Sequence, residues 1–176
     1  MKTRVERRAF LRVYDGKMWY YASVTDLANL QKTLDGLYEA ATPNPAILDD
    51  PVVRRFECNR DTVMSFADCS VRDIPQKDKQ ALLLSYLPIV SDDPSITLTI
   101  GMYLDRNSIF CFKSSLGADI TYDYQTCGIA FLCSMAEGEK KFTGHWQKGA
   151  TRFDELTGVE DELRKAAAEQ TAFMRN

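Results

Sequence analysis

Residues 95–146 read SITLTIGMYLDRNSIFCFKSSLGADITYDYQTCGIAFLCSMAEGEKKFTGHW. The stretch holds three or four extended segments separated by turn residues, and no helical period interrupts them. Its first segment alternates with a period of two, which is the side-chain period of a β-strand. One face carries Ile96, Leu98, Ile100, Met102 and Leu104, and the other carries Thr97, Thr99 and Tyr103. The pattern predicts an antiparallel meander, the largest block of strand in the chain.

Small and polar residues predict three turns in this meander, at residues 104–108, 114–117 and 136–139. After the second turn, tyrosines and small residues alternate with Cys127, Ile129, Phe131 and Cys133. The alternation puts Cys127 and Cys133 on the apolar face of their strand. A thiol in this position is more simply interpreted as a core packing residue than as a nucleophile.

A hairpin and a helix are predicted before the meander. Asp15 and Gly16 lie between two β-prone runs, and glycine accepts a positive φ without a Cβ clash. Ser23 or Thr25 is then expected to cap a helix that continues to about Ala41. Its apolar stripe consists of Leu27, Leu30, Leu34, Leu37, Tyr38 and Ala41. The start of the chain is therefore predicted to form two strands followed by a helix, a ββα unit.

Two further helices are expected, at residues 75–90 and 151–174. The first has Ala81, Leu82, Ser85 and Ile89 on one face. Pro88 predicts an end or a kink near Tyr86, because proline removes a backbone donor. The second helix is amphipathic with a charged, solvated face. Residues 52–58 and 62–66 are read as short strands between loops.

These elements predict an α+β fold, in which an antiparallel, twisted sheet carries two to three helices on one face as a two-layer sandwich. The length of 176 residues fits a single domain. A hairpin followed by a helix at each end of the chain suggests an internal ββα duplication.

The composition, with 45% hydrophobic and 27% charged residues, is typical of a globular protein. The net charge of −3 gives no overall attraction to nucleic acid or anionic lipid. Arginines near the aromatic residues of the first hairpin leave open a nucleic-acid surface, although hairpin strands use aromatic residues for packing anyway. No apolar run approaches the roughly 20 residues of a membrane helix, and no signal peptide is evident. We expect a cytoplasmic protein.

Catalytic and metal-binding patterns are missing from the sequence. The five cysteines lack CxxC spacing and are read as free thiols, and His145 is the only histidine. Asp49-Asp50 and Asp92-Asp93 resemble carboxylate pairs, but each precedes a proline, which favours turn and capping roles. The sequence contains no Walker loop, GxGxxG, GxSxG, HExxH or EF-hand pattern.

The chain resembles the N-terminal domain of the TldD/PmbA family, proteins long called modulators of DNA gyrase and regarded as zinc metallopeptidases. The resemblance is diffuse over residues 13–27 and denser over residues 73–156, where the order and spacing of short matches carry it. The matching segments are DKQALL at 78–83, DPSI at 93–96, Tyr103 with Asp105, SLG at 115–117, AEGE at 136–139 and residues 149–156. Ser114 stands where the family usually has asparagine.

The resemblance implies a non-catalytic part of a longer protein. The family's HExxxH helix and its cysteine ligand lie in a C-terminal domain that this chain lacks, so zinc is expected there and no cofactor is expected here. Expected partners are that peptidase domain, a peptide substrate, and a second subunit in a homo- or heterodimer. Ser114, Ser115 and Gly117 are the candidate peptide contacts.

Two functions follow as hypotheses. In the first, the chain is the substrate-side, scaffold domain of a TldD/PmbA-like metallopeptidase, and a strand edge of the meander holds an extended peptide. The chain alone is then expected to hydrolyse nothing. In the second, it is a stand-alone protein-interaction or assembly module that acts through an apolar patch. Neither a membrane nor a nucleic acid is an expected partner.

Overall fold

The structure, a computed structural model, describes residues 3–176. Whereas the sequence predicted one domain, the chain divides into two compact units, Met1–Cys58 and Asn59–Asn176. Each unit combines helices with a sheet that contains antiparallel strands, which confirms the predicted α+β class. In the part of the chain that the structure describes, no helix is long and apolar enough to cross a membrane.

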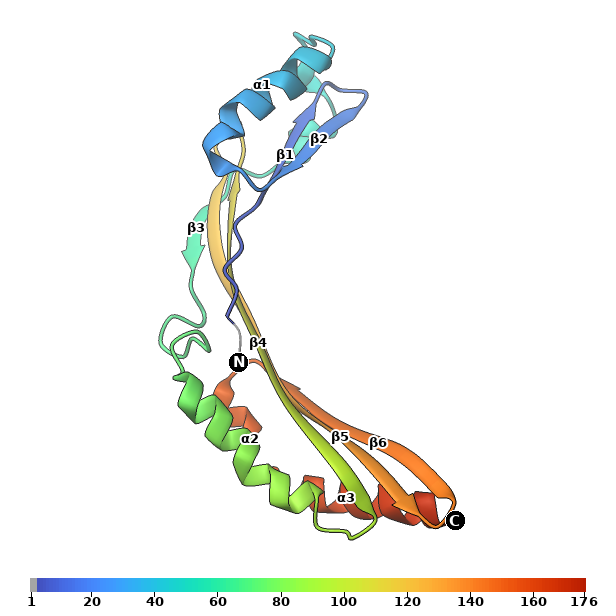
Figure 1. The fold of residues 1–176 in the computed structure, drawn as a ribbon. Helices are drawn as coiled ribbons and strands as arrows, with labels where there is room; N and C mark the ends of the chain where they lie inside the picture. Colours follow the sequence, from blue (N-terminus) through green and yellow to red (C-terminus); the bar gives the residue numbers. More distant parts are fainter. Residues whose placement is uncertain (1–2) are drawn as a thin grey trace. The chain divides into compact units, whose positions relative to one another are not determined.

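The first unit is a hairpin with a helix packed on it (Figure 1). Strands β1 (Ala9–Tyr14) and β2 (Trp19–Val24) pair antiparallel around the predicted turn at Asp15 and Gly16. Helix α1 (Leu30–Ala40) follows a short 3-10 helix, Leu27–Asn29. The predicted cap at Ser23 or Thr25 is wrong, because Ser23 belongs to β2 and the Asp26 carboxylate accepts the N–H of Ala28 at 3.0 Å.

The arginines and aromatic residues of this hairpin contact one another. The guanidinium of Arg12 lies 5.0 Å from the ring centroid of Trp19, which stacks on Tyr14 at 4.7 Å. Arg4 and Arg8 both form ion pairs with Glu6. Packing within the hairpin therefore accounts for the cluster that the sequence left open as a nucleic-acid surface.

The carboxylate of Asp15 organises the hairpin turn. It accepts the N–H groups of Lys17 and Met18 at 2.8 Å each, and that of Thr42 at 3.2 Å. The bonds from Met18 and Lys17 hold the pKa of Asp15 at about 2, below its usual 3.8. Because the folded-state pKa is the lower one, the stabilisation is present above pH 3.8 and is lost as the pH falls towards 2.

We expect Asp15→Asn to weaken the first unit at neutral pH and to remove part of its acid sensitivity. In a Trp146→Phe background, the fluorescence of Trp19 reports urea unfolding of this unit alone as a function of pH. Asp35→Asn, on the exposed surface of α1, is the matched control. Equal pH dependence in the Asp15 and Asp35 variants would contradict the assigned role of Asp15.

The second unit is built on a four-stranded sheet with β5 (Asp119–Glu137) at its centre (Figure 1). Strand β4 (Ile96–Lys113) runs antiparallel along one side of β5. On the other side, β3 (Arg60–Val63) pairs parallel with the first residues of β5, and β6 (Lys140–Ala150) pairs antiparallel with its second half. The predicted meander is thus confirmed as three strands.

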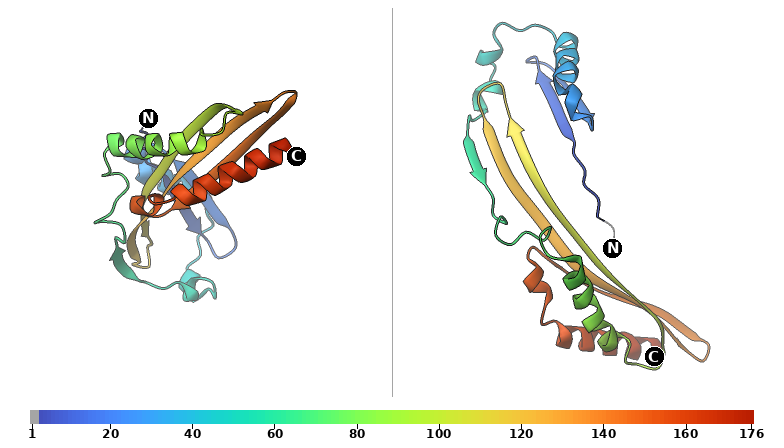
Figure 2. Two further views of the ribbon diagram at one scale, coloured as in Figure 1. Left: turned by 90° about the horizontal axis from the view of Figure 1, so that it is seen from below. Right: turned by 60° about the vertical axis from the view of Figure 1, so that its left-hand side comes forward.

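Helices α2 (Gln76–Val90) and α3 (Glu160–Arg175) cover one face of this sheet (Figure 2). The core between the layers includes alternate residues of β5, as the sequence predicted, together with side chains from both helices. Its buried residues are Val71, Tyr86, Val90, Cys127, Ile129, Phe131, Cys133, Met135, Leu156, Val159, Leu163 and Met174. A hairpin followed by a helix occurs in each unit.

Several expectations about the helices were wrong. Helix α2 does not end near Tyr86 but continues through Pro88 to Val90. Of its predicted face, Leu82 and Ile89 pack against the core, whereas Ala81 and Ser85 are exposed. Residues 151–174 are not one helix, because Gly158 has a φ of 70° between the 3-10 helix Phe153–Leu156 and α3. A left-handed residue cannot continue a right-handed helix.

The predicted turn at residues 104–108 is also wrong. Strand β4 runs straight through it, and Leu104 and Ser108 pair with Gly128 and Tyr124. The polar side chains in this run have tertiary partners: Asp105 bonds to Lys79 of α2, and Asn107 donates to Gln125 at 3.3 Å. The segment lacks glycine and proline, so its backbone has no local reason to reverse.

The start of β4 differs from the simple alternation. An irregularity between Ile96 and Leu98 shifts the register, as a β-bulge does, so Ile96 packs against the core while Leu98 is exposed. In the first unit, residues 53–55 form a 3-10 helix in place of a predicted strand, whereas in the second unit β3 overlaps the predicted strand at 62–66. The loop after β3 is fixed by Asp123, which accepts the N–H groups of Ser65 and Phe66.

Candidate functional site

Strand β4 is an unpaired edge of the sheet over its whole length. Its 18 residues, apart from Thr97 at the irregularity, pair with β5 on one side, and among residues 3–176 no strand pairs with its other side. An edge strand presents alternate N–H and C=O groups without partners, and proteins usually protect such edges with charge, proline or a covering element. The first nine residues, from Ile96 to Leu104, contain neither charge nor proline. This half of the edge is therefore chemically open to an added strand.

A cluster from α2 and β4 lies on the covered face beside this edge. The ammonium of Lys79 bonds to Asp105 and lies 5.5 Å from the ring centroid of Tyr103. The Tyr103 hydroxyl is buried, and no hydrogen-bond partner for it is present among the described residues. Burial, and then the charge of Asp105, raise the pKa of Tyr103 well above its usual value. The tyrosine stays protonated and is not an acid–base group near neutral pH.

The two buried thiols of the core, Cys127 and Cys133, are poor nucleophiles as well. Burial, followed by the charge of Asp105, raises the pKa of Cys127 to about 11. Burial likewise raises the pKa of Cys133, whose thiol lies 3.5 Å from the carbonyl of Val90. Because the thiolate is the nucleophilic form, both side chains are packing residues, as their place in the alternation predicted.

The three predicted peptide contacts lie together in the turn between β4 and β5, and their polar groups bond within it. Ser114 accepts the N–H of Ala118 on its hydroxyl at 3.2 Å and the N–H of Gly117 on its carbonyl at 3.0 Å. Gly117 has a φ of 103°, which favours glycine, and its carbonyl accepts a bond from Arg60 at 2.8 Å. Ser115 is exposed. These contacts give Ser114 and Gly117 a role in the turn, and their contact with peptide stays a prediction.

The paired aspartates have the turn and capping roles that the sequence predicted. Asp50 accepts the N–H of Val52 at 2.7 Å, and Asp49 pairs with Arg54. Asp93 accepts both the N–H and the hydroxyl of Ser95 and is bridged by Arg175. Asp49, Asp50 and Asp93 are thus engaged in local hydrogen bonds or ion pairs.

His145 is exposed on β6 opposite Leu132 of β5. Among residues 3–176, no group of three or more histidine, cysteine or acidic side chains is arranged to hold a metal ion.

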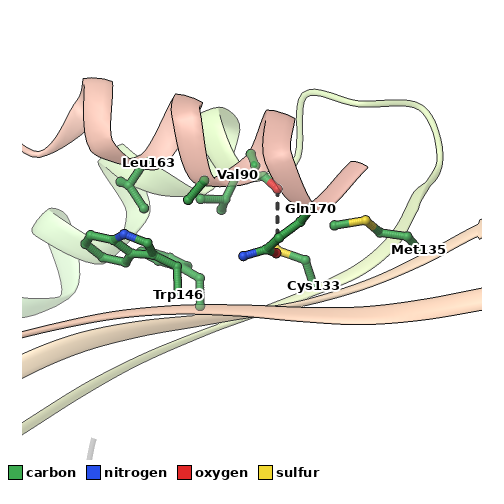
Figure 3. Close-up of a pocket in the computed structure, with 9 residues that line it drawn as sticks. Val90, Cys133, Met135, Trp146, Leu163 and Gln170 are labelled. Atoms are coloured by element: carbon green, nitrogen blue, oxygen red, sulfur yellow. Dashed lines mark hydrogen bonds between the residues drawn. The ribbon is translucent and has the colours of Figure 1, made fainter. Parts of the chain in front are cut away.

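The enclosed pocket beneath α3 is a packing space (Figure 3). Leu163 and Gln170 of α3 point towards the sheet there, against Trp146, Cys133 and Met135. Its volume is about 10 Å³, close to the room that one water molecule needs. The cavity therefore belongs to the core and is too small for a substrate.

The sequence predicted that a strand edge of the meander holds the peptide, but it did not identify β4 as that edge or show which face of β4 the helices leave exposed. The alternation from Leu98 to Leu104 was visible, but the helices cover the opposite face, which carries Gly101 and Tyr103. The glycine at 101 was the available signal, because a Cβ there would approach the ring of Phe131 to 3.0 Å.

No protein-family model matches the chain, and no curated protein matches it.

Proposed function

We propose that this chain is a non-catalytic peptide-holding domain, in which the edge of β4 binds an extended peptide as an added strand. The observation that carries the proposal is the 18-residue edge strand, paired on one side only within the described residues. Strand addition draws its affinity from main-chain hydrogen bonds, so it makes few demands on the peptide's side chains. The ligand class is therefore an extended or unfolded polypeptide segment.

The chemistry around the edge supports holding without cutting. Tyr103 and Cys127, the ionisable core groups near this edge, have raised pKa values. The pairs Asp49-Asp50 and Asp92-Asp93 lie in loops, where Asp50 and Asp93 accept local hydrogen bonds. The proposal agrees with the resemblance to the TldD/PmbA family, in which a second domain would supply zinc and the chemistry. We place the protein in the cytoplasm, where its free thiols stay reduced.

Fluorescence anisotropy tests this proposal with a labelled octapeptide of alternating valine and threonine. We expect saturable binding, and we expect mass spectrometry to recover the peptide intact. The matched control is the same peptide N-methylated at every second amide on its pairing edge. It keeps the side chains but loses the donors, so its affinity should fall by about tenfold or more. Equal binding of both peptides, or cleavage of either one that a chelator prevents, would refute the proposal.

The alternative function, an assembly module, is favoured by a different observation. One face of the sheet in the second unit exposes large apolar side chains on either side of Arg106 and Ser108. Peptide addition at an edge uses backbone groups, whereas this face offers side chains, so the two functions do not compete for the same atoms.

A further inference from the structure

The sheet of the second unit has one covered face and one open face. Eight large apolar side chains, each 42–72% exposed, lie on the open face, which is defined by Leu98, Ile100, Met102, Leu104, Phe110, Phe112, Tyr122 and Tyr124. All six from β4 are even-numbered, and the antiparallel register puts Tyr122 and Tyr124 opposite Phe110 and Ser108. Directly opposed residues share a face of the sheet. The eight therefore lie on one face, in two groups that Arg106 and Ser108 separate along β4.

The helices leave this surface uncovered. Both α2 and α3 pack on the odd-numbered residues of β5, such as Phe131 and Cys133, as Figure 3 shows for α3 above the strands. The rings of Phe110 and Tyr122 stack on the open face with centroids 5.1 Å apart. A monomeric protein rarely exposes a contiguous apolar patch larger than a few hundred Å². A surface of this size indicates an interface.

The distribution of charge on the open face indicates which kind of partner could bind there. From Leu98 to Leu104, the even residues of β4 and their β5 and β6 neighbours on the same face include no acidic, lysine or arginine side chain. Arg106 and Lys141 lie at the two ends of this neutral stretch. A neutral apolar surface does not select a strongly charged partner such as nucleic acid. It matches a second neutral, apolar sheet face.

We propose that the open face binds the open face of a second copy of this chain, forming a two-sheet sandwich. Half-exposed side chains of this size each have on the order of 100 Å² of accessible surface to bury. The eight together therefore approach the roughly 800 Å² that each partner buries in a standard interface. Two twisted sheets pack face to face about 10 Å apart, with strands about 30° from parallel. The contact is isologous, because the same residues serve both partners. The proposal does not depend on peptide binding at the β4 edge.

Leu104 is the most sensitive position for a test. It is the most exposed of the eight, at 72%, and lies near the middle of the row from Leu98 to Phe112. A two-fold axis through the middle brings the two copies of Leu104 close together. Leu104→Glu then places two carboxylates in an apolar contact, where their desolvation and mutual repulsion oppose association. Its exposure in the single chain means that the fold should tolerate the change.

Sedimentation velocity from about 1 µM to about 100 µM measures the outcome, a range that spans micromolar dissociation constants. We expect the wild type to form dimers in this range, and Leu104→Glu to weaken association by about tenfold or more. Leu84→Glu is the matched control, since Leu84 is 54% exposed on α2, and it should dimerise like the wild type. Far-UV circular dichroism checks that each variant is folded, and Met102→Lys replaces Leu104→Glu if that variant unfolds.

A wild type that stays monomeric at about 100 µM overturns the proposal, since an interface of standard size should hold at that concentration. A dimer that persists in the folded Leu104→Glu or Met102→Lys variant also overturns the proposal. A dimer weakened equally by Leu84→Glu would place the contact on the helical side and overturn it as well.

Discussion

Replacing Gln125 by methionine should destabilise the second unit by about 3 kcal/mol, because it removes the partner of the buried Val71 N–H and of the part-buried carbonyls of Cys69 and Thr151. Gln125 is 0% exposed and uses both ends of its amide. The amide oxygen accepts the N–H of Val71 at 3.0 Å, and the amide nitrogen donates to the carbonyls of Cys69 and Thr151 at 3.1 and 2.7 Å. One side chain on β5 thus ties the loop before α2 and the end of β6 to the sheet.

Urea unfolding, followed by circular dichroism, measures the change in the free energy of unfolding. Gln80→Met is the matched control, because Gln80 is exposed on α2, and it should change stability by less than about 0.5 kcal/mol. Hydrogen exchange at the amide of Val71 should also accelerate in the Gln125 variant. A loss of stability equal to that of the control would show that the buried network does not hold the loop.

Phe131→Ala is expected to cost about 3–5 kcal/mol, the usual range for removing a buried phenylalanine and leaving a cavity. Phe131 is 1% exposed at the centre of β5, with the ring of Trp146 at 6.4 Å and the backbone of Gly101 beneath it. Gly101 has no side chain that could fill the space, and its strand is held in place by pairing with β5. The loss should therefore fall in the upper part of that range.

The same substitution on the open face provides the control. Phe112 lies on β4 of the same sheet and is 45% exposed, so Phe112→Ala should cost less than about 1.5 kcal/mol. Both variants are compared by urea unfolding at a low, fixed protein concentration. Similar losses in the two variants would mean that the two faces of the sheet are equally buried in solution, contrary to the structure.

The strands that were predicted well are those in which the residues of the strand itself alternate between apolar and polar. In β5, the buried Cys127, Ile129 and Phe131 alternate with exposed or half-buried residues, and this period of two needs no tertiary information. The turns at 114–117 and 136–139 combine glycine with small or charged residues. The predicted start of the last helix failed for the opposite reason, because Phe153 and Leu156 keep the helical spacing across the break at Gly158.

The features that were not predicted depend on tertiary contacts between residues that are distant in the sequence. Asp105 and Asn107 look like turn residues until Lys79 and Gln125, distant in sequence, supply their partners. The alternation in β4 predicted a strand but not which of its faces the helices would cover. Whether a strand is an edge is likewise a property of the whole sheet. The candidate site is made of these non-local features, so the sequence predicted a strand edge in the meander without identifying the strand, and it named residues only in the neighbouring turn at Ser114.

The two proposals assign the second unit two separate ways of binding a polypeptide. The edge of β4 offers main-chain groups over the uncharged residues from Ile96 to Leu104. The open face offers side chains such as Met102 and Leu104. A dimer formed through the open faces would leave both β4 edges free, so assembly and peptide binding are compatible in one particle.

Amide hydrogen exchange by nuclear magnetic resonance, with and without the valine–threonine octapeptide, tests the central claim most directly. In an edge strand, every second N–H points away from the sheet. Peptide addition should therefore slow exchange at alternate residues of β4, while the intervening amides, already bonded to β5, and the amides of β6 stay unchanged. Protection without this alternation, protection elsewhere only, or no protection in β4 at saturating peptide would contradict the proposal that the β4 edge holds the peptide.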